Sequence, residues 1–564
     1  MTPHFKPNRL QASVKSGVLA LLIGANTLAP LGAQSQLPAL GDGSEMTTSA
    51  ERRLGDRIAR EIYRDPDYLD DPLLVEYVQG IWQQLMVASR ARGELNPELD
   101  ERFAWEIFLA RDRSVNAFAL PGGYFGVHLG LIGLVASRDE LASVLGHEMS
   151  HVTQRHIARL IARQSEQTPW LIGAMILGAL AASKSPDAAN ALILGGQGVA
   201  IQNQLNFSRD MEREADRVGY AVMTSAGFEA EGFASMFGKL QQANRINDNG
   251  SFPYLRSHPL TTERIADVQA RQQLAAPTRR TGPPDLVHPM MAARARVLAS
   301  PGVDVLRSWV REAELAGTNA VAPAAASSAP ASKLGAMGQP SPTQRRVGVL
   351  YAAALASAKL RDLPGARAQA NTLAPLVAGD SAAQRVLQLL LADIALQANN
   401  PAQALQILQA LPADSAVAAA GPAASPSRAS SGHAFYPTRG RAELLLLSQA
   451  RLAAPAPAGL AEVAQRLQTW VSVYARDAQA WTQLSSVQSA LGQPVQAARS
   501  SAESRAAQLD YPAALDRMRA AQQLQRQNPQ RGGNDYIEAS IVDQRTRELQ
   551  AQVTELAREK ALER

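Results

Sequence analysis

The residues best suited to chemistry lie in one short stretch, His147-Glu148-Met149-Ser150-His151, which follows the pattern H-E-x-x-H. Apolar residues recur at helical spacing around it, so we predict that it lies inside a buried helix. Residues four apart share one helical face, and His147 and His151 can therefore point both imidazoles at one metal ion, for which zinc is well suited. Glu148 would stand beside that metal as the general base for a water molecule. The stretch predicts a hydrolytic zinc centre.

Such a centre needs a third protein ligand, and His156 is the nearest histidine in the sequence. On a continuous helix His156 would point about 180° away from His147. No glycine lies between His151 and His156 to break that helix. We therefore expect His156 to be a surface or core histidine that does not reach the metal.

The acidic segment 208–216 offers a better ligand. Glu212 and Asp216 lie four residues apart on one helical face, whereas Glu214 points to the other side. Glu212 can complete a set of two histidines and one glutamate, and Asp216 can hydrogen-bond a ligand imidazole from behind. Taken alone, the same cluster also fits an ordinary charged and solvated helix turn.

The two motifs together, H-E-x-x-H and then S-R-x-x-E-x-x-A-D some sixty residues later, resemble those of the HtpX / CAAX prenyl-endopeptidase family of zinc metallopeptidases. The resemblance covers about residues 45–275. It implies one Zn²⁺ per chain, bound by His147, His151 and Glu212. It also implies that Asp216 supports the ligands from behind.

The same resemblance draws attention to a loop histidine, His258, in the segment Ser257-His258-Pro259-Leu260. In a member of the family a His-Pro-Leu loop supplies a further metal contact. By that resemblance His258 is a possible fourth metal contact, a latch that keeps the zinc closed until the loop moves. A competing hypothesis makes His258 a donor that stabilises the oxyanion formed during cleavage. A loop histidine without a metal contact is the third alternative.

We predict an α+β fold: a mainly helical, zincin-type metallopeptidase domain (45–275) with a small β-sheet, followed by an all-α, TPR-like array (285–564). Regular elements are expected as helices at 50–64 and 72–92, and as strands at 103–109, 115–119 and 124–131. The stretch 115–124 resembles the strand and turn before the family's zinc helix. A sheet edge of this kind can hold an extended peptide, so Asn116 and Phe118 are candidate substrate-binding residues.

Two apolar runs, 170–182 and 188–201, lie between the two motifs. Each falls short of the ~20 residues that a membrane span needs, so we expect buried helices or a lid over the active site. Membrane association is expected to be peripheral at most. The net charge of +5 is spread along the chain without a basic block, which gives no case for binding to nucleic acid.

Residues 1–33 have the form of a secretory signal peptide, in which basic residues precede a short apolar run and small residues follow it. The chain has no cysteine, which excludes a disulfide framework and a cysteine zinc site. Export of such a chain suits the periplasm of a Gram-negative type of envelope.

The region 285–564 is rich in alanine, leucine and glutamine, with low-complexity segments at 317–342 and 413–438. Helices are expected to begin, after short loops, at Pro364, Pro401, Pro457 and Pro494. The first two prolines are 37 residues apart, and so are the last two. This period favours TPR hairpins over an unrelated helical bundle, and a TPR array binds other proteins on its concave face.

These patterns support two functions. In the first, the protein is an exported zinc endopeptidase. By the resemblance, its polypeptide substrates are misassembled outer-membrane β-barrel proteins, and its TPR region binds the barrel assembly machinery. In the second, it is a non-enzymatic scaffold or chaperone with a structural or vestigial zinc site. The first is preferred because Glu148 has no role in a purely structural site. Residues beyond about 285 are expected to be dispensable for zinc binding but needed to choose substrates.

Overall fold

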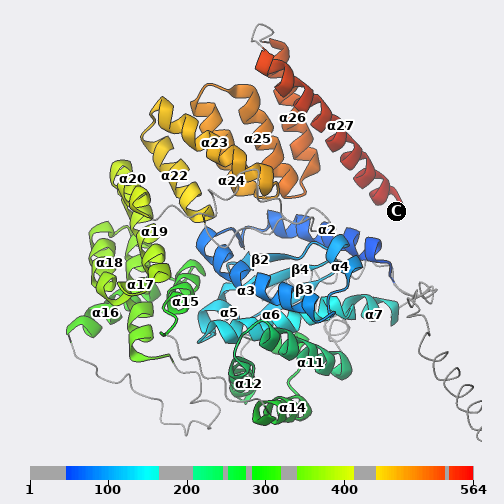
Figure 1. Ribbon diagram of the computed structural model, residues 1–564, viewed down its shortest axis with the longest axis vertical. Coiled ribbons are helices and arrows are strands. Elements are labelled where there is room, and N and C mark those ends of the chain that lie inside the picture. Colours follow the sequence, from blue (N-terminus) through cyan, green and yellow to red (C-terminus); the bar gives the residue numbers. More distant parts are fainter. Residues whose placement is uncertain are drawn as a thin grey trace, which may run out of the picture. The chain divides into compact units, whose positions relative to one another are not determined.

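The computed structural model describes residues 46–163, 208–245, 252–274, 283–318, 340–411, 440–527 and 533–562 (Figure 1). The predicted signal peptide, both apolar runs and most of the two low-complexity segments lie outside these residues. The described chain is mostly helical with one small sheet, which confirms the α+β class. Among the helices in these ranges, none is both long enough and apolar enough to cross a membrane.

A four-stranded sheet in the order β1-β2-β4-β3 lies in the N-terminal part of the described chain (Figure 1). Its strands are β1 (Tyr68–Leu69), β2 (Glu106–Ala110), β3 (Ala117–Leu120) and β4 (Tyr124–His128). β2 and β4 are parallel, and the other two pairs are antiparallel. Gly122 and Gly123 turn the chain between β3 and β4, with φ of 72° and 80° that other residues rarely adopt. Among the described strands β3 pairs with β4 alone, so it forms an edge of the sheet.

The three expected strands are present, with different ends. The strand expected at 103–109 begins only at Glu106, because Trp105 has a left-handed backbone (φ 50°) that interrupts the extended chain. The strand expected at 124–131 is shorter than predicted and is followed by a short helix, α5 (Leu129–Leu134).

The helices up to residue 274 are α2 (Thr48–Arg64), α3 (Pro72–Ala91), α4 (Pro97–Arg102), α5 (Leu129–Leu134), α6 (Arg138–Thr153), α7 (His156–Arg163), α11 (Arg209–Ser225), α12 (Ala230–Arg245), α13 (Tyr254–Ser257) and α14 (Thr262–Leu274). The helices expected at 50–64 and 72–92 correspond to α2 and α3. α6, which carries the H-E-x-x-H motif, packs against α11, α12 and β3. Residues 139–153 of α6 are all buried, so the predicted buried helix is confirmed.

The described chain beyond residue 283 contains only helices: α15 (Val287–Leu298), α16 (Val303–Thr318), α17 (Pro342–Lys359), α18 (Leu363–Val377), α19 (Ser381–Gln397), α20 (Pro401–Ala410), α22 (Arg441–Ala453), α23 (Pro457–Val473), α24 (Ala478–Ala490), α25 (Pro494–Ala507), α26 (Tyr511–Gln527) and α27 (Gly533–Leu562). The four prolines of the predicted repeat each lie in the first turn of a helix, namely α18, α20, α23 and α25. Proline is tolerated there because the first-turn amides have no partner within the helix.

One apolar core runs from α3 to α22, from Leu73 to Ala442, so these later helices pack on the same core as the sheet. Three ion pairs accompany this packing: Arg294 with Asp71 at 2.6 Å, Arg385 with Glu76 at 2.9 Å, and Arg441 with Asp70 at 2.7 Å. Acidic residues around the start of α3 thus each meet an arginine from beyond residue 285. The domain boundary at 275–285 stays a prediction.

Candidate metal centre

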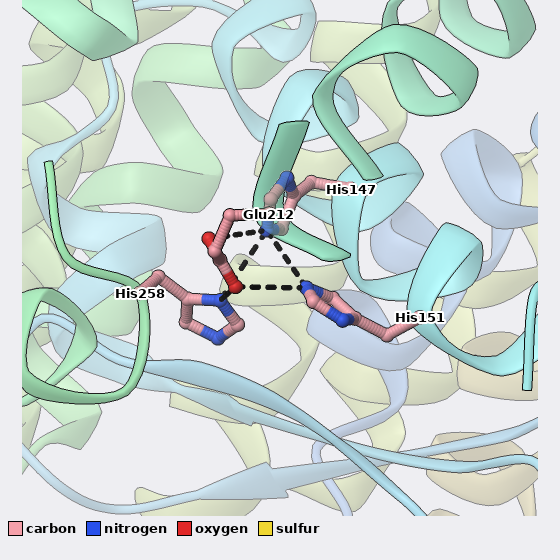
Figure 2. Close-up of side chains that lie close together, drawn as sticks. All are labelled: His147, His151, Glu212 and His258. Carbon is pink, nitrogen blue, oxygen red and sulfur yellow. Dashed lines mark hydrogen bonds and ion pairs between the residues drawn. The ribbon is translucent and has the colours of Figure 1, made fainter. Parts of the chain in front are cut away.

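Helix α6 presents His147 and His151 on one face, as their spacing predicts (Figure 2). The helix begins after Ser137, whose side-chain oxygen accepts a hydrogen bond from the Glu140 amide at 3.2 Å. Burial of residues 139–153 fixes the rotation of the helix within the core. The Nε2 atoms of His147 and His151 lie 3.0 Å apart, so both imidazoles face the same point.

Helix α11 crosses α6 at a pair of glycines, Gly146 and Gly219. A Cβ atom added to Gly219 would lie 2.9 Å from the carbonyl carbon of Gly146 and from the amide nitrogen of His147, which is closer than real Cβ atoms come. The missing side chains let the two backbones approach each other. As a result Glu212 Oε2 lies 3.6 Å from His147 Nε2, and Asp216 Oδ1 lies 3.0 Å from His147 Nδ1.

Four buried side chains converge on one point: His147, His151, Glu212 and His258 (Figure 2). One ligand atom from each lies within 4.8 Å of the other three. His258 Nδ1 is 3.0 Å from Glu212 Oε1 and 3.3 Å from His147 Nε2. His151 Nε2 is 3.4 Å from Glu212 Oε1. Four ligands arranged tetrahedrally around zinc, at roughly 2.0–2.1 Å, are about 3.3 Å from one another, so these separations fit a zinc centre.

Two charged side chains, Asp216 and Arg264, contact the candidate ligands on the side away from the cluster centre. Asp216 is in contact with His147, and Arg264 on α14 pairs with both oxygens of Asp216, at 2.7 and 2.9 Å. Arg264 Nη1 also lies 2.7 Å from Glu212 Oε2 and donates to the carbonyl oxygen of Pro259 at 2.8 Å. Arg264 therefore joins the ligand helix α11 to the loop that precedes α14. Sequence analysis missed this arginine, whose only local signal is its place in the first turn after that loop.

Glu148 lies next to the four converging ligands and is 1% exposed. Its charged neighbour is His258, whose Nε2 lies 3.4 Å from Glu148 Oε1, and the Tyr254 side chain also lies close enough to influence it. Burial raises the pKa of Glu148. A buried carboxyl group with a raised pKa, placed beside a cluster of metal-binding side chains, is suited to exchange a proton with a bound molecule.

The electrostatics of the cluster favour a cation at its centre. Burial opposes a charge on His147, yet hydrogen bonds to Asp216 and Glu212 outweigh it and raise the pKa of His147 to about 10. Burial would raise the pKa of Glu212, but the neighbouring His258 and His147 hold it well below its usual range. Burial and the charge of His147 lower the pKa of His151. The carboxylates therefore attract positive charge, which a metal ion can supply in place of a proton.

The loop that carries His258 is anchored on both sides. The His258 amide donates to the Tyr254 carbonyl at 2.9 Å, and the two rings stack with centroids 4.6 Å apart. The Thr261 side-chain oxygen accepts a hydrogen bond from the Arg264 amide at 3.3 Å, at the start of the next helix. The Nδ1 atom of His258 faces the ligand cluster while Nε2 faces Glu148. One side chain thus contacts both the candidate ligand Glu212 and the neighbouring Glu148.

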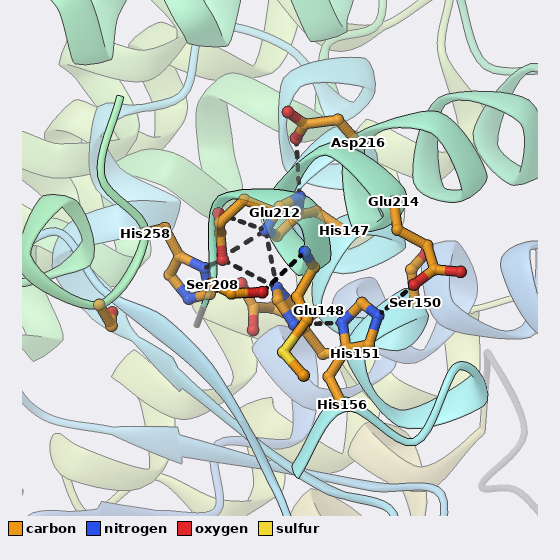
Figure 3. Close-up of polar contacts among 12 residues, drawn as sticks. His147, Glu148, Ser150, His151, His156, Ser208, Glu212, Glu214, Asp216 and His258 are labelled. Carbon is orange, nitrogen blue, oxygen red and sulfur yellow. Dashed lines mark hydrogen bonds and ion pairs between the residues drawn. The ribbon is translucent and has the colours of Figure 1, made fainter. Parts of the chain in front are cut away.

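The expectation of a continuous helix up to His156 is wrong. Helix α6 ends at Thr153, Arg155 has a left-handed backbone (φ 54°), and α7 begins at His156. This break brings His156 Nδ1 to 2.9 Å from His151 Nδ1 (Figure 3). His156 is a buried histidine outside the group of four ligands, as expected. No sequence pattern predicts this break, because a non-glycine residue rarely adopts a left-handed backbone.

Asn116 and Phe118 lie beside and within the edge strand β3. Asn116 is 8% exposed, and its Oδ1 has no hydrogen-bond partner among the described residues. The Phe118 ring rests over Gly126 of β4, where an added Cβ would lie only 2.1 Å from it. α6 packs against β3, so this edge strand adjoins the zinc helix. Their role in substrate binding stays a prediction.

Residues 76–272 match the sequence profile of Peptidase family M48. The chain therefore carries a peptidase M48 domain, and this domain includes all four converging ligands. The predicted resemblance to a metallopeptidase family is confirmed at this level.

Among named proteins, the chain is similar to the "Putative beta-barrel assembly-enhancing protease" of Vibrio cholerae, with 35% identity over 287 residues (50% of this chain, 56% of that protein). It is 31% identical over 271 residues to the beta-barrel assembly-enhancing protease of Escherichia coli K12 (47% and 54%). It is 30% identical over 236 residues to the mitochondrial metalloendopeptidase OMA1 of Arabidopsis thaliana (41% and 43%). The chain spans about half the length of these relatives.

Proposed function

We propose that the protein is a zinc metalloendopeptidase of the periplasm that cleaves polypeptides during the assembly or quality control of outer-membrane β-barrel proteins. The observation that carries this proposal is the buried Glu148 beside the cluster of four candidate ligands. The match to Peptidase family M48 supports hydrolysis of peptide bonds, and the names of the bacterial relatives support barrel proteins as the substrate class.

We infer that His147, His151 and Glu212 hold the zinc ion, because their ligand atoms face one point at tetrahedral separations. When bound, zinc acts as a Lewis acid toward a peptide carbonyl and lets a water molecule lose a proton near neutral pH. Asp216 accepts the Nδ1 proton of His147 and so leaves Nε2 free to bind the ion. Arg264 holds Asp216 in place and limits the negative charge of the cluster.

Glu148 serves as the general base. It takes a proton from the attacking water and later passes it to the leaving amine. Its raised pKa suits this task, because a group that accepts and returns a proton works best near the ambient pH. The substrate peptide lies along the edge strand β3 by strand addition, with Asn116 and Phe118 beside it.

His258 acts as a latch on this site. Its Nδ1 occupies the fourth ligand position and its Nε2 faces Glu148, so it keeps out both the water and the substrate. A catalytic zinc needs an open position, and the loop must therefore move before cleavage. This movement would break the hydrogen bond from the His258 amide to the Tyr254 carbonyl and the contact between Arg264 and the Pro259 carbonyl.

The helices beyond residue 285 are proposed to form a TPR-like array that binds the barrel assembly machinery. The succession of packed helix pairs and the prolines that begin them support this reading. Export through a signal peptide at 1–33 and function in the periplasm are part of the same proposal.

A structural zinc in a non-enzymatic scaffold is the second candidate. The closed set of four protein ligands favours it, because structural zinc sites are usually closed in this way. Glu148 has no function in such a protein, although burial of its carboxyl group costs free energy.

The test uses the full chain and an unfolded outer-membrane β-barrel protein as substrate. Cleavage is measured before and after a chelator, and again after zinc is restored. His258→Ala is assayed in parallel, so that a closed resting site does not hide the activity. We expect cleavage that is lost with the chelator and restored by zinc. If both the natural protein and His258→Ala bind the substrate without cleaving it, the result would support the scaffold.

A further inference from the structure

Each α6 ligand imidazole must present Nε2 to the metal without a proton, so the proton must sit on Nδ1 and needs an acceptor there. For His147 the acceptor is Asp216, at 3.0 Å. For His151 the neighbour of Nδ1 is a second imidazole, His156, at 2.9 Å. A histidine can accept that proton only if its own Nδ1 is unprotonated, and that requires a proton on its Nε2.

Glu214 supplies the acceptor that a proton on Nε2 of His156 requires. Its Oε2 lies 3.0 Å from His156 Nε2, so the carboxylate accepts the Nε2 proton of His156 (Figure 3). The Nδ1 lone pair of His156 is then free to accept the Nδ1 proton of His151. The Nε2 lone pair of His151 is in turn directed at the ligand cluster, 3.4 Å from Glu212 Oε1. The series of contacts from Glu214 through His156 to His151 thus has one consistent assignment of proton donors and acceptors.

We propose that Glu214 and His156 are positioning residues that set the tautomer and orientation of His151 for metal binding. This inference rests on the proposed zinc site and assigns a task to a carboxylate on the far side of α11 from Glu212. Glu214 is not a ligand, in agreement with its expected direction. It acts on the metal through two imidazoles, as Asp216 acts through one.

The local backbone supports this assignment. His156 can reach His151 only because the chain reverses at Arg155, whose left-handed backbone (φ 54°) costs of order 1 kcal/mol for a residue with a side chain. Arg155 is held in that turn by an ion pair with Glu51 at 3.2 Å. The His156 side chain is then fully buried between two polar partners. Arg159 of α7 adds a second contact to Glu214, at 3.0 Å.

The experiment measures zinc affinity by competition with a chelating dye, so it needs no cleavage activity. Glu214→Ala and His156→Phe should each bind zinc about 10-fold more weakly than the natural protein, or worse, because loss of such supporting contacts typically costs 10- to 100-fold. Asp210→Ala is the matched control: it removes an acidic group from the same helix, and Asp210 is 82% exposed and pairs with Arg213. Its zinc affinity should not change.

His156→Asn separates positioning from a general structural role. The asparagine Oδ1 can stand where Nδ1 of His156 stood and accept the His151 proton without help from Glu214. We therefore expect His156→Asn to bind zinc nearly as well as the natural protein, and Glu214→Ala to cause no further loss in that background. Equal losses from Glu214→Ala in both backgrounds, or no loss in either, would overturn the proposal. If the natural protein binds no zinc, the proposed function fails first.

Discussion

Gly219→Ala should separate the two helices that build the metal centre. The new Cβ would lie 2.9 Å from backbone atoms of Gly146 and His147, whereas ordinary contacts begin at 3.4 Å. Neither backbone atom can rotate aside, so α11 must move away from α6 by about 0.5 Å. Zinc ligands tolerate displacements of only about 0.2 Å, so the displacement is large enough to disturb Glu212 relative to the two histidines.

Two terms set the expected loss of stability. Overpacking of a buried contact costs roughly 1–3 kcal/mol. Replacement of glycine by alanine within a helix returns about 1 kcal/mol through its higher helix propensity. We expect Gly219→Ala to lower the free energy of unfolding of the metal-free protein by up to about 2 kcal/mol. Its zinc affinity should fall about 10-fold or more, because the ligands are held together by this crossing.

The assay combines urea unfolding of the metal-free protein with zinc competition. Gly459→Ala is the control, since a Cβ at that helical position meets the end of the Arg451 side chain, which can move away. We expect the control to be neutral or slightly stabilised, with unchanged zinc affinity. Gly219→Ala with natural zinc affinity would refute the idea that close approach of α6 and α11 positions the ligands.

Glu212→Ala should abolish zinc binding in equilibrium dialysis, and full occupancy would show that another group is the third ligand. His258→Ala should cleave faster or less selectively, whereas a fall of roughly 10²–10³-fold with zinc still bound would favour the oxyanion donor over the latch. Arg441→Leu should destabilise the protein by roughly 3–5 kcal/mol in thermal or urea melts, because it leaves the buried Asp477 without its positively charged partner, while Arg558→Leu at the surface should cost little. A fragment of residues 34–275 should still bind zinc but melt at a lower temperature; failure to bind would show that the later helices support the metal centre.

The ligands on α6 could be predicted from sequence because two histidines four residues apart must share a helical face. Helical geometry separates Glu212 and Asp216 from Glu214, but the choice of Glu212 as third ligand came from the family resemblance. The structure brings Glu212 into the cluster. The neighbours of these ligands depend on contacts between distant segments. Arg264 reaches Asp216 across 48 residues of sequence, and no periodic pattern marks such a pair.

The position of His156 could not be predicted from the sequence, for a different reason. Helical periodicity assumes that the helix continues, and no glycine or proline marks the reversal at Arg155. The start of β2 was mispredicted for a related reason. An alternation of apolar and polar residues does not reveal that Trp105 has a left-handed backbone. Local rules therefore predict which side chains share an element, and fail where one residue adopts an uncommon backbone conformation.

The most direct test of the account is the cleavage rate of Glu148→Gln at a measured zinc content. The substitution keeps the size of the side chain and removes only its ability to accept and return a proton. We predict one zinc per chain, as in the natural protein, and cleavage slower by roughly 10²–10⁴-fold, the usual contribution of a general base. Natural cleavage by a zinc-loaded Glu148→Gln protein would contradict the proposed mechanism.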